Sequence, residues 1–389
     1  MNICISTDNY PSEGKAVNVF VEQLVCALVD LGVEINVIAP QSITKVFFQH
    51  EKLLPKVKDY VTKKGNRYKV FRPYKMSFGN GHKSLYKLVG SFNAKRFNLC
   101  LSRIHPDVCY GHFMHCGLKM LDYASREGLP LFVACGEGDN ALENTLESLP
   151  QKRFDLLKQT LRGVVSVSTE NKRKCLHYGV APEENITVLP NCVDTSIFHE
   201  HDREQVRAEM KIGPEDFVVV FVGGFIPRKG PDRVAKAITK LNDDHIKVMF
   251  IGKPFSGYDY DFDCSGIIYK GTANHDDLPK LLNCADIFVL PTQKEGCCNA
   301  IVEALACGLP VVSSDGPFND DILDEDNSIR LDPMDIDGIA KAIAYLRDNR
   351  DARQKMRECS LARHEWYSIE DRAKKIKSFI EDKSCFVSK

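Results

Sequence analysis

The chain has 389 residues, of which 43% are hydrophobic and 27% are charged, and its formal net charge is −1. This composition excludes a disordered or fibrous protein, and the length exceeds the roughly 250–300 residues that one hydrophobic core usually supports, so two domains are expected. The near-zero charge argues against a protein that binds nucleic acid over its whole surface.

No apolar run reaches the length of about 18 residues that a transmembrane helix needs. Residues 1–11 lack the basic head and long apolar stretch of a signal peptide. Fifteen cysteines scattered along a chain without an export signal are expected to be reduced thiols. We therefore expect a cytoplasmic protein.

The first forty residues predict a βαβ unit. A strand over 3–6 precedes a loop with Gly14 and Lys15, and apolar residues then recur at helical spacing over 17–29 before a second strand over 35–39. A connection through a helix implies that the two strands are parallel. Glycine in the loop would let the backbone approach a ligand closely, although an ordinary turn glycine is the alternative.

The same alternation begins again in the second half. The predicted strands and helices, in chain order, are strand 217–222, helix 232–241, strands 248–251, 267–269 and 287–290, helix 300–307 and strand 309–313. The chain is therefore predicted to be an α/β protein with two Rossmann-like parallel-sheet domains, 1–197 and 198–368. A last helix over about 369–389 packs on one of them, and the pattern leaves open whether it returns to the first.

The stretch 290–312 carries the strongest chemical pattern. It runs strand, loop, helix, Gly-Leu-Pro turn and strand, with Glu295 in the loop and Glu303 along the helix. The start of a helix presents backbone N–H groups and the positive end of its dipole, which suit a diphosphate. The two carboxylates could hold sugar hydroxyls, or they could be a capping residue and a solvated helix residue.

Five segments in order resemble glycosyltransferase family 4. The pattern E-x7-E followed by Ala-Leu-Ala-Cys-Gly-Leu-Pro-Val-Val is similar to its donor-site signature. The other four segments are 105–112, 188–194, 221–230, and 271–278 followed by 285–291. The resemblance implies a GT-B fold, with two Rossmann-like domains facing a central cleft, and a retaining transferase that uses nucleotide sugars.

The resemblance also implies roles for residues of the second domain. Lys229 and Arg228 would neutralise the donor diphosphate as the leaving group develops charge, and Lys229 and Glu295 are expected in the catalytic set. Glu303 would bind the ribose. The full expected donor set is Arg228, Lys229, Gly230, Glu295, Gly296, Cys298, Asn299, Ala300 and Glu303.

One position departs from the family pattern. Many members carry arginine where this chain has Gly224. Arg228, four residues further on, is the hypothetical replacement for that cation.

In the first domain, the resemblance singles out His112 at the end of a predicted strand. The family's histidine contacts the donor sugar or assists at the reaction centre, whereas a structural histidine is the alternative. Gly14, Lys15 and Glu137 are the expected acceptor-side residues. Cys109, His112, His115 and Cys116 look like metal ligands but lack a clear ligand-pair spacing, so no metal is expected.

A basic segment is hidden in the neutral total. Residues 51–103 hold fourteen Lys and Arg against only Glu51 and Asp59, with eight interleaved aromatics. Attraction to an anionic membrane or to a lipid-diphosphate acceptor is one reading, and a solvated helical region is another. No nucleic-acid-binding motif accompanies the segment.

The expected function is therefore transfer of a sugar from a UDP- or GDP-sugar to a hydroxyl of a glycan or lipid-linked glycan, in surface polysaccharide biosynthesis, with no cofactor and no metal. The rivals are a GT-B nucleotide-sugar 2-epimerase, which would need further carboxylates, and a non-catalytic binding subunit. A site at the cytoplasmic face of the membrane would fit the basic segment.

Overall fold

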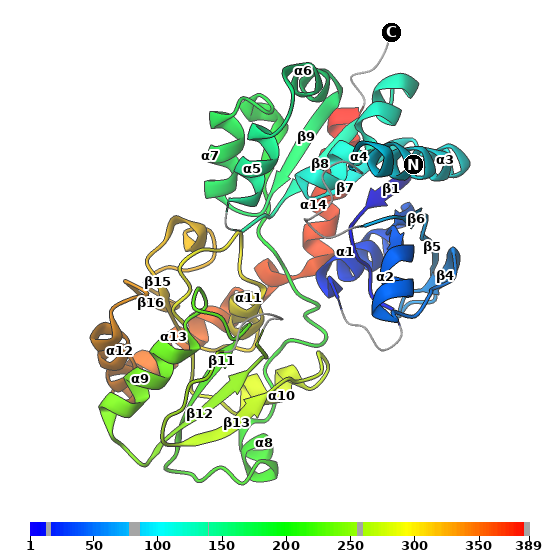
Figure 1. The fold of residues 1–389 in the computed structure, drawn as a ribbon. Coiled ribbons are helices and arrows are strands. Elements are labelled where there is room, and N and C mark those ends of the chain that lie inside the picture. The colour runs from blue at the N-terminus through cyan, green and yellow to red at the C-terminus, as the bar shows by residue number, and fades with distance from the viewer. Residues whose placement is uncertain (13–16, 78–85, 139, 255–259, 385–389) are drawn as a thin grey trace. The chain divides into compact units, whose positions relative to one another are not determined.

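The structure is a computed structural model that describes residues 1–12, 17–77, 86–138, 140–254 and 260–384. The chain divides into two compact units (Figure 1). The N-terminal unit comprises Met1–Val167, Asn171–Leu189 and Glu370–Lys389, and the C-terminal unit comprises Ser168–Glu170 and Pro190–Ile369. Each unit is described by itself.

The N-terminal unit is built on an eight-stranded sheet with the order β10-β9-β8-β7-β1-β2-β5-β4. All neighbours pair in parallel except β4 and β5, which form an antiparallel hairpin at one edge. The strands are β1 (Asn2–Ser6), β2 (Glu34–Ile38), β4 (Val57–Val61), β5 (Arg67–Phe71), β7 (Val108–His112), β8 (Leu131–Cys135), β9 (Leu161–Ser166) and β10 (Ile186–Val188), and the pair β3 (Gln41–Ser42) with β6 (Tyr74–Lys75) lies apart.

Helices with one apolar face flank this sheet. In α1, the buried residues Val21, Leu24, Val25 and Leu28 recur at helical spacing and cover the sheet. The helices are α1 (Val19–Asp30), α2 (Ile43–Gln49), α3 (Tyr86–Ile104), α4 (Met114–Glu127), α5 (Ala141–Glu147), α6 (Gln151–Thr160), α7 (Thr169–His177), η2 (Glu183–Asn185) and α14 (Ile369–Ser384). β7, β8 and most of β1 are fully buried, as expected for parallel strands covered on both faces.

The C-terminal unit has a six-stranded, entirely parallel sheet with the order β13-β12-β11-β14-β15-β16. Its strands are β11 (Phe217–Val222), β12 (Ile246–Ile251), β13 (Ile267–Gly271), β14 (Ile287–Leu290), β15 (Val311–Ser314) and β16 (Ser328–Leu331). Its helices are α8 (Arg203–Glu209), α9 (Pro231–Leu241), α10 (Leu278–Asn283), α11 (Asn299–Ala306), η3 (Pro317–Asn319), α12 (Ile336–Asp348), α13 (Arg350–Ala362) and η4 (His364–Tyr367), and α9 packs against α12 (Figure 1).

The predicted fold class, α/β with two Rossmann-like parallel sheets, is confirmed. The C-terminal helix α14 belongs to the N-terminal unit, where Phe379 lies edge-on to Phe132 with ring centroids 6.0 Å apart. The C-terminal unit begins at Pro190, upstream of the predicted boundary at 197/198. Hydrogen bonds from Val193 to Tyr367 (2.8 Å) and from Ile369 to Val193 (2.9 Å) tie this segment into that unit.

The basic segment is only partly helical. Its first half forms the β4–β5 hairpin and β6, and its second half forms α3. The interleaved aromatics of the hairpin pack on one another, since Tyr60 stacks on Tyr68 at 5.5 Å and the Tyr10 hydroxyl donates to that of Tyr68 at 3.0 Å. These ring contacts therefore help to hold the hairpin against the rest of the unit.

No helix among the described residues is both long enough and apolar enough to cross a bilayer.

Candidate active-site residues in the two units

Parallel α/β sheets bind ligands at the carboxyl ends of their strands, where the strand order reverses. In the C-terminal unit that point lies between β11 and β14, which are neighbours in the sheet. The loop after β11 carries Arg228 and Lys229, and the loop after β14 carries Glu295. The topology therefore brings together the charged residues that the sequence predicted for the donor diphosphate and sugar.

The Glu295 carboxylate is the centre of this cluster. Its Oε1 accepts hydrogen bonds from Arg228 Nη1 at 2.9 Å and Thr292 Oγ1 at 2.6 Å, and Lys229 Nζ lies 2.6 Å away. Burial of Lys229 acts to lower its pKa, but the nearby charges of Cys298 and Glu295 outweigh burial and the pKa is raised. Arg228 and Lys229 thus converge on one carboxylate oxygen.

The two loops are tied to each other by Arg233, a residue that the sequence analysis did not single out. Arg233, in the first turn of α9, is 5% exposed and donates to the carbonyls of Pro227 at 2.8 Å and Pro291 at 2.7 Å. Gly230 must be glycine, because its φ is +74° and an added Cβ would lie 2.3 Å from the Arg233 guanidinium. The only sequence signal for Arg233 is a basic residue close behind the glycine loop.

The start of α11 lies at the same edge of the sheet. Cys298 is the N-cap residue, so the predicted donor residues Gly296, Cys298, Asn299 and Ala300 form the approach to and first turn of this helix. Asn191, from the segment 188–194, donates to the Cys297 carbonyl at 3.0 Å and to Asn299 Oδ1 at 2.8 Å. This asparagine positions the helix start, a role that the motif alone did not reveal.

Glu303 is partly buried on α11, and burial raises the pKa of its carboxyl group to about 7. Gly224 lies in the loop after β11, where its carbonyl accepts a hydrogen bond from the Ile226 amide at 3.0 Å. Arg228 stays a candidate replacement for a cation at Gly224, with its guanidinium already engaged by the carbonyl of Lys294 and by Glu295.

In the N-terminal unit, the strand order reverses between β1 and β7. His112 is the last residue of β7, and its ring packs against Phe20 and Phe113. Burial, with the charges of Arg372 and His115 adding to it, lowers the pKa of His112 to about 3, so the imidazole is neutral. Its buried Nδ1 has no hydrogen-bond partner within the described parts of the chain.

Phe113 follows with a φ of +84°, an outlier for a bulky residue. This strained residue turns the chain from β7 into α4. Glu137, predicted on the acceptor side, accepts from the backbone amides of Met114 at 2.7 Å and Gly136 at 3.0 Å, so its carboxylate caps the start of α4. Gly14 and Lys15, predicted for the same side, lie outside the described residues.

A charged cluster lies beside His112 at the β1/β7 switch point. Asp8, which follows β1, contacts His115 Nε2 at 2.5 Å and the Lys119 ammonium. Cys116 Sγ lies 3.3 Å from His115 Nε2, so the Asp8, His115 and Cys116 ligand atoms are close enough to hold a metal. The Lys119 ammonium, 3.9 Å from Cys116 Sγ, already supplies a cation to this cluster.

Two family models match the chain and together cover most of it. Residues 17–197 match Glycosyltransferase Family 4, and residues 202–361 match Glycosyl transferases group 1. The chain belongs to this family of glycosyltransferases, as the five motifs indicated, and is an enzyme of the GT-B type.

Two relatives show how far the similarity extends. A proposed teichuronic acid biosynthesis glycosyltransferase of Bacillus subtilis is 25% identical over 361 residues, which cover 88% of each chain. A D-inositol 3-phosphate glycosyltransferase of Mycobacterium marinum is 27% identical over 284 residues, which cover 67% of this chain. The match spans only 60% of the length of the Mycobacterium protein.

Solved structures share the fold at low identity. Sucrose-phosphate synthase from Thermosynechococcus elongatus has a TM-score of 0.75 at 16% identity, with 98% of each chain covered. The Anabaena protein HepE in complex with UDP-glucose has a TM-score of 0.71 at 15% identity, covering 98% of this chain and 100% of that one.

Proposed function

We propose that this glycosyltransferase moves a sugar, with retention of anomeric configuration, from a UDP- or GDP-sugar to a hydroxyl of a glycan or lipid-linked glycan in surface polysaccharide biosynthesis. The observation that carries the proposal is the convergence of Arg228 and Lys229 on Glu295 at the β11/β14 switch point. The teichuronic acid biosynthesis assigned to the Bacillus relative and the UDP-glucose bound to the Anabaena protein add support.

The chemistry of each donor-side group follows from its charge. Arg228 and Lys229 would neutralise the nucleoside diphosphate as it leaves, which requires no metal ion. Arg228, Lys229 and Thr292 all contact Oε1 of Glu295, so Oε2 would be the oxygen that accepts a hydrogen bond from a sugar hydroxyl. The Glu303 carboxylate would accept hydrogen bonds from the ribose hydroxyls.

His112 would act as a neutral hydrogen-bonding group toward the donor sugar. Because its pKa is lowered to about 3, His112 is a neutral imidazole at neutral pH and lacks the second ring proton that an imidazolium would give as a general acid. The acceptor hydroxyl would approach on the leaving-group side, and its proton would pass to the departing phosphate oxygen. This front-face route needs no protein nucleophile, which agrees with the engagement of Glu295 by two cations.

A thermal-shift panel of nucleoside diphosphates and nucleotide sugars tests the proposal, because a ligand of the folded state raises the unfolding temperature. We expect one uridine or guanosine series to stabilise the protein, and Lys229→Met to remove most of that shift. Unchanged melting temperatures with every nucleotide sugar would contradict the proposed function.

We further propose that the basic segment 51–103 touches an anionic membrane surface. Ten of its cations are exposed, and exposed apolar side chains lie on the same unit, with Phe47 76% and Phe48 79% exposed on α2. Flotation with neutral and with anionic liposomes tests this contact. Salt-sensitive binding to anionic liposomes alone is expected, and equal recovery with both would rule it out.

A further inference from the structure

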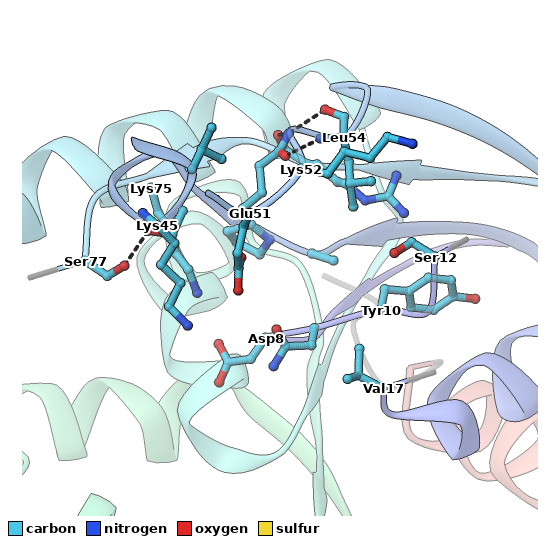
Figure 2. A pocket seen from close by; sticks show the side chains of 17 residues that line it. Asp8, Tyr10, Ser12, Val17, Lys45, Glu51, Lys52, Leu54, Lys75 and Ser77 are labelled. Atoms are coloured by element: carbon cyan, nitrogen blue, oxygen red, sulfur yellow. Dashed lines mark hydrogen bonds between the residues drawn. The ribbon is translucent and has the colours of Figure 1, made fainter. Parts of the chain in front are cut away.

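The N-terminal unit contains a pocket that none of the roles above uses. It has a volume of about 550 Å³ and opens beside the carboxyl ends of β1 and β2 (Figure 2). Its charged lining consists of Lys45 on α2, Lys52, Arg72 and Lys75, with Asp8 and Glu51 as the acids. Lysine and glutamate side chains reach into it from the side opposite Asp8 (Figure 2).

The pocket has an excess of positive charge. The Asp8 carboxylate is already engaged by His115, 2.5 Å away, and by an ion pair with Lys119. Lys75 is half-buried; burial lowers its pKa, the charge of Asp8 opposes that change, and the charges of Lys119 and Lys45 add to it. Four cations thus line the pocket against two acids, and one of those acids, Asp8, is shared with Lys119.

Arg72 gives an independent sign of a missing anion. Its side chain is 2% exposed, and Nη2 donates to the Tyr60 hydroxyl at 2.6 Å. The guanidinium also lies over the Tyr60 ring, 5.6 Å from its centroid. Its Nη1 nevertheless has no hydrogen-bond partner, and no carboxylate forms an ion pair with Arg72, among the residues that the structure describes. Burying a guanidinium without a counter-charge is costly, so a bound anion would relieve a penalty that the free protein carries.

The walls of the pocket are fixed in place by polar contacts. Gln41 clamps Leu54 with two hydrogen bonds, of 2.9 Å from Nε2 and 3.0 Å to Oε1, which holds the loop that bears Lys52. The Ser42 hydroxyl, at the start of α2, lies 2.5 Å from the Ser77 hydroxyl. Lys45 and Lys75 are thereby presented from two segments joined to each other, as a preorganised anion site requires.

From these contacts we infer that the pocket binds the phosphate or diphosphate group of a phosphorylated acceptor, held by Lys45, Arg72 and Lys75. The inference rests on the proposed function for the identity of the acceptor side. It narrows the proposed acceptors from glycans in general to phosphorylated ones. A neutral oligosaccharide would leave the positive charge of Arg72 without a counter-charge. A lipid-linked diphosphate and a soluble sugar phosphate share this chemistry.

The test is binding of inorganic pyrophosphate, by titration calorimetry, to the full chain carrying Lys229→Met, which silences the proposed donor cation. Adding Lys75→Met should weaken pyrophosphate binding at least tenfold. Lys69→Met, an exposed lysine of β5 with the same change in charge, should alter it less than twofold. Equal effects of the two changes, or no binding before either, would overturn the inference.

Arg72→Met should cause a similar loss, and because it also removes a contact with Tyr60, its melting temperature must be checked alongside that of Lys75→Met. Competition with pyrophosphate then distinguishes the two acceptor sources. The competitors are polyprenyl diphosphate in detergent micelles and hexose 1-phosphate in solution, and the compound that displaces pyrophosphate identifies the acceptor class. If neither competes, the acceptor assignment is wrong. Nucleotide-sugar binding by Lys75→Met is expected to equal that of the unmodified chain, so a chain that binds no nucleotide sugar refutes the proposed function and not the phosphate pocket.

Discussion

The orientation of the Glu295 carboxylate is set by contacts with neighbouring residues and not by its own loop alone. Two cations and a hydroxyl converge on one oxygen, so the carboxylate is held in one orientation. Removing either cation would do two things at once. It would expose the leaving diphosphate to incomplete neutralisation, and it would release Glu295 from its position.

Arg228→Ala and Lys229→Ala are therefore both expected to lower kcat by at least about 100-fold, the usual cost of losing one preorganised charge partner of the transition state. Initial rates at saturating nucleotide sugar measure the effect. Lys294→Ala, in the neighbouring loop, is the matched control and should retain most of the activity. Turnover near that of the unmodified enzyme in Arg228→Ala would remove the hypothesis that Arg228 replaces a cation at Gly224.

Glu303 predicts a pH dependence of donor binding. With a pKa raised by burial to about 7, the group is neutral below that pH and a carboxylate above it. If the carboxylate accepts the ribose hydroxyls, affinity for the nucleotide sugar should rise about tenfold from pH 6 to pH 8, following the ionised fraction. Calorimetric titration at fixed ionic strength measures this rise. Glu303→Gln should bind weakly with a flat profile, and an unchanged slope in that variant would assign the titration elsewhere.

At the scale of elements, the donor-side edge depends on two loops that belong to different βα units. Parallel pairing of β11 with β14 places them side by side, and Arg233 joins them through carbonyls of both. Helix α9 thus contributes its glycine cap to the loop after β11 and its first-turn arginine to the loop after β14.

Arg233→Met should lower the free energy of unfolding by about 2–4 kcal/mol, because two buried carbonyls lose a charged donor. It should also weaken nucleotide-sugar binding, since the loops that carry Arg228 and Glu295 would no longer be joined to each other. Chemical denaturation and the thermal-shift assay report the two effects. Lys236→Met removes an exposed cation from the same helix and should change neither. A loss of binding with full stability would show that Arg233 contacts the ligand itself.

At the scale of the whole molecule, the chain crosses between its units more than once. After the C-terminal unit is complete, α14 returns to the N-terminal unit, where Arg372 Nε donates to the Leu189 carbonyl at 3.3 Å and Lys377 Nζ to the Leu31 carbonyl at 3.2 Å. The N-terminal unit is therefore built from both ends of the chain.

Ile376→Ala, at a fully buried position of α14, should destabilise the N-terminal unit by about 2–5 kcal/mol. Hydrogen exchange followed strand by strand should show loss of protection in the N-terminal sheet, while β11 and β14 keep theirs. Lys375→Ala, on the exposed side of the same helix, is the control. Equal loss in both sheets would mean that the two units unfold together.

Local pattern in the sequence was sufficient for the class of fold, and it selected the candidate donor-side residues, whose roles stay predictions. Strand runs such as 217–222, helical spacing over 17–29 and the E-x7-E loop are each contained in a short window, so they are readable without knowledge of distant contacts. The charge excess of residues 51–103 is likewise a local property. The unit that receives α14 was left open because helix periodicity indicates an apolar face and not the surface that covers it.

Only the tertiary structure decided which of these groups meet. The contacts of Glu295 with Lys229, of Arg233 with Pro291 and of Asp8 with His115 each join segments far apart in the chain, through the parallel pairing of strands whose order the sequence does not state. The Nη1 of Arg72, which has no hydrogen-bond partner among the described residues, is recognised only once burial and neighbours are known, because a sequence records the charge of a side chain and not its surroundings.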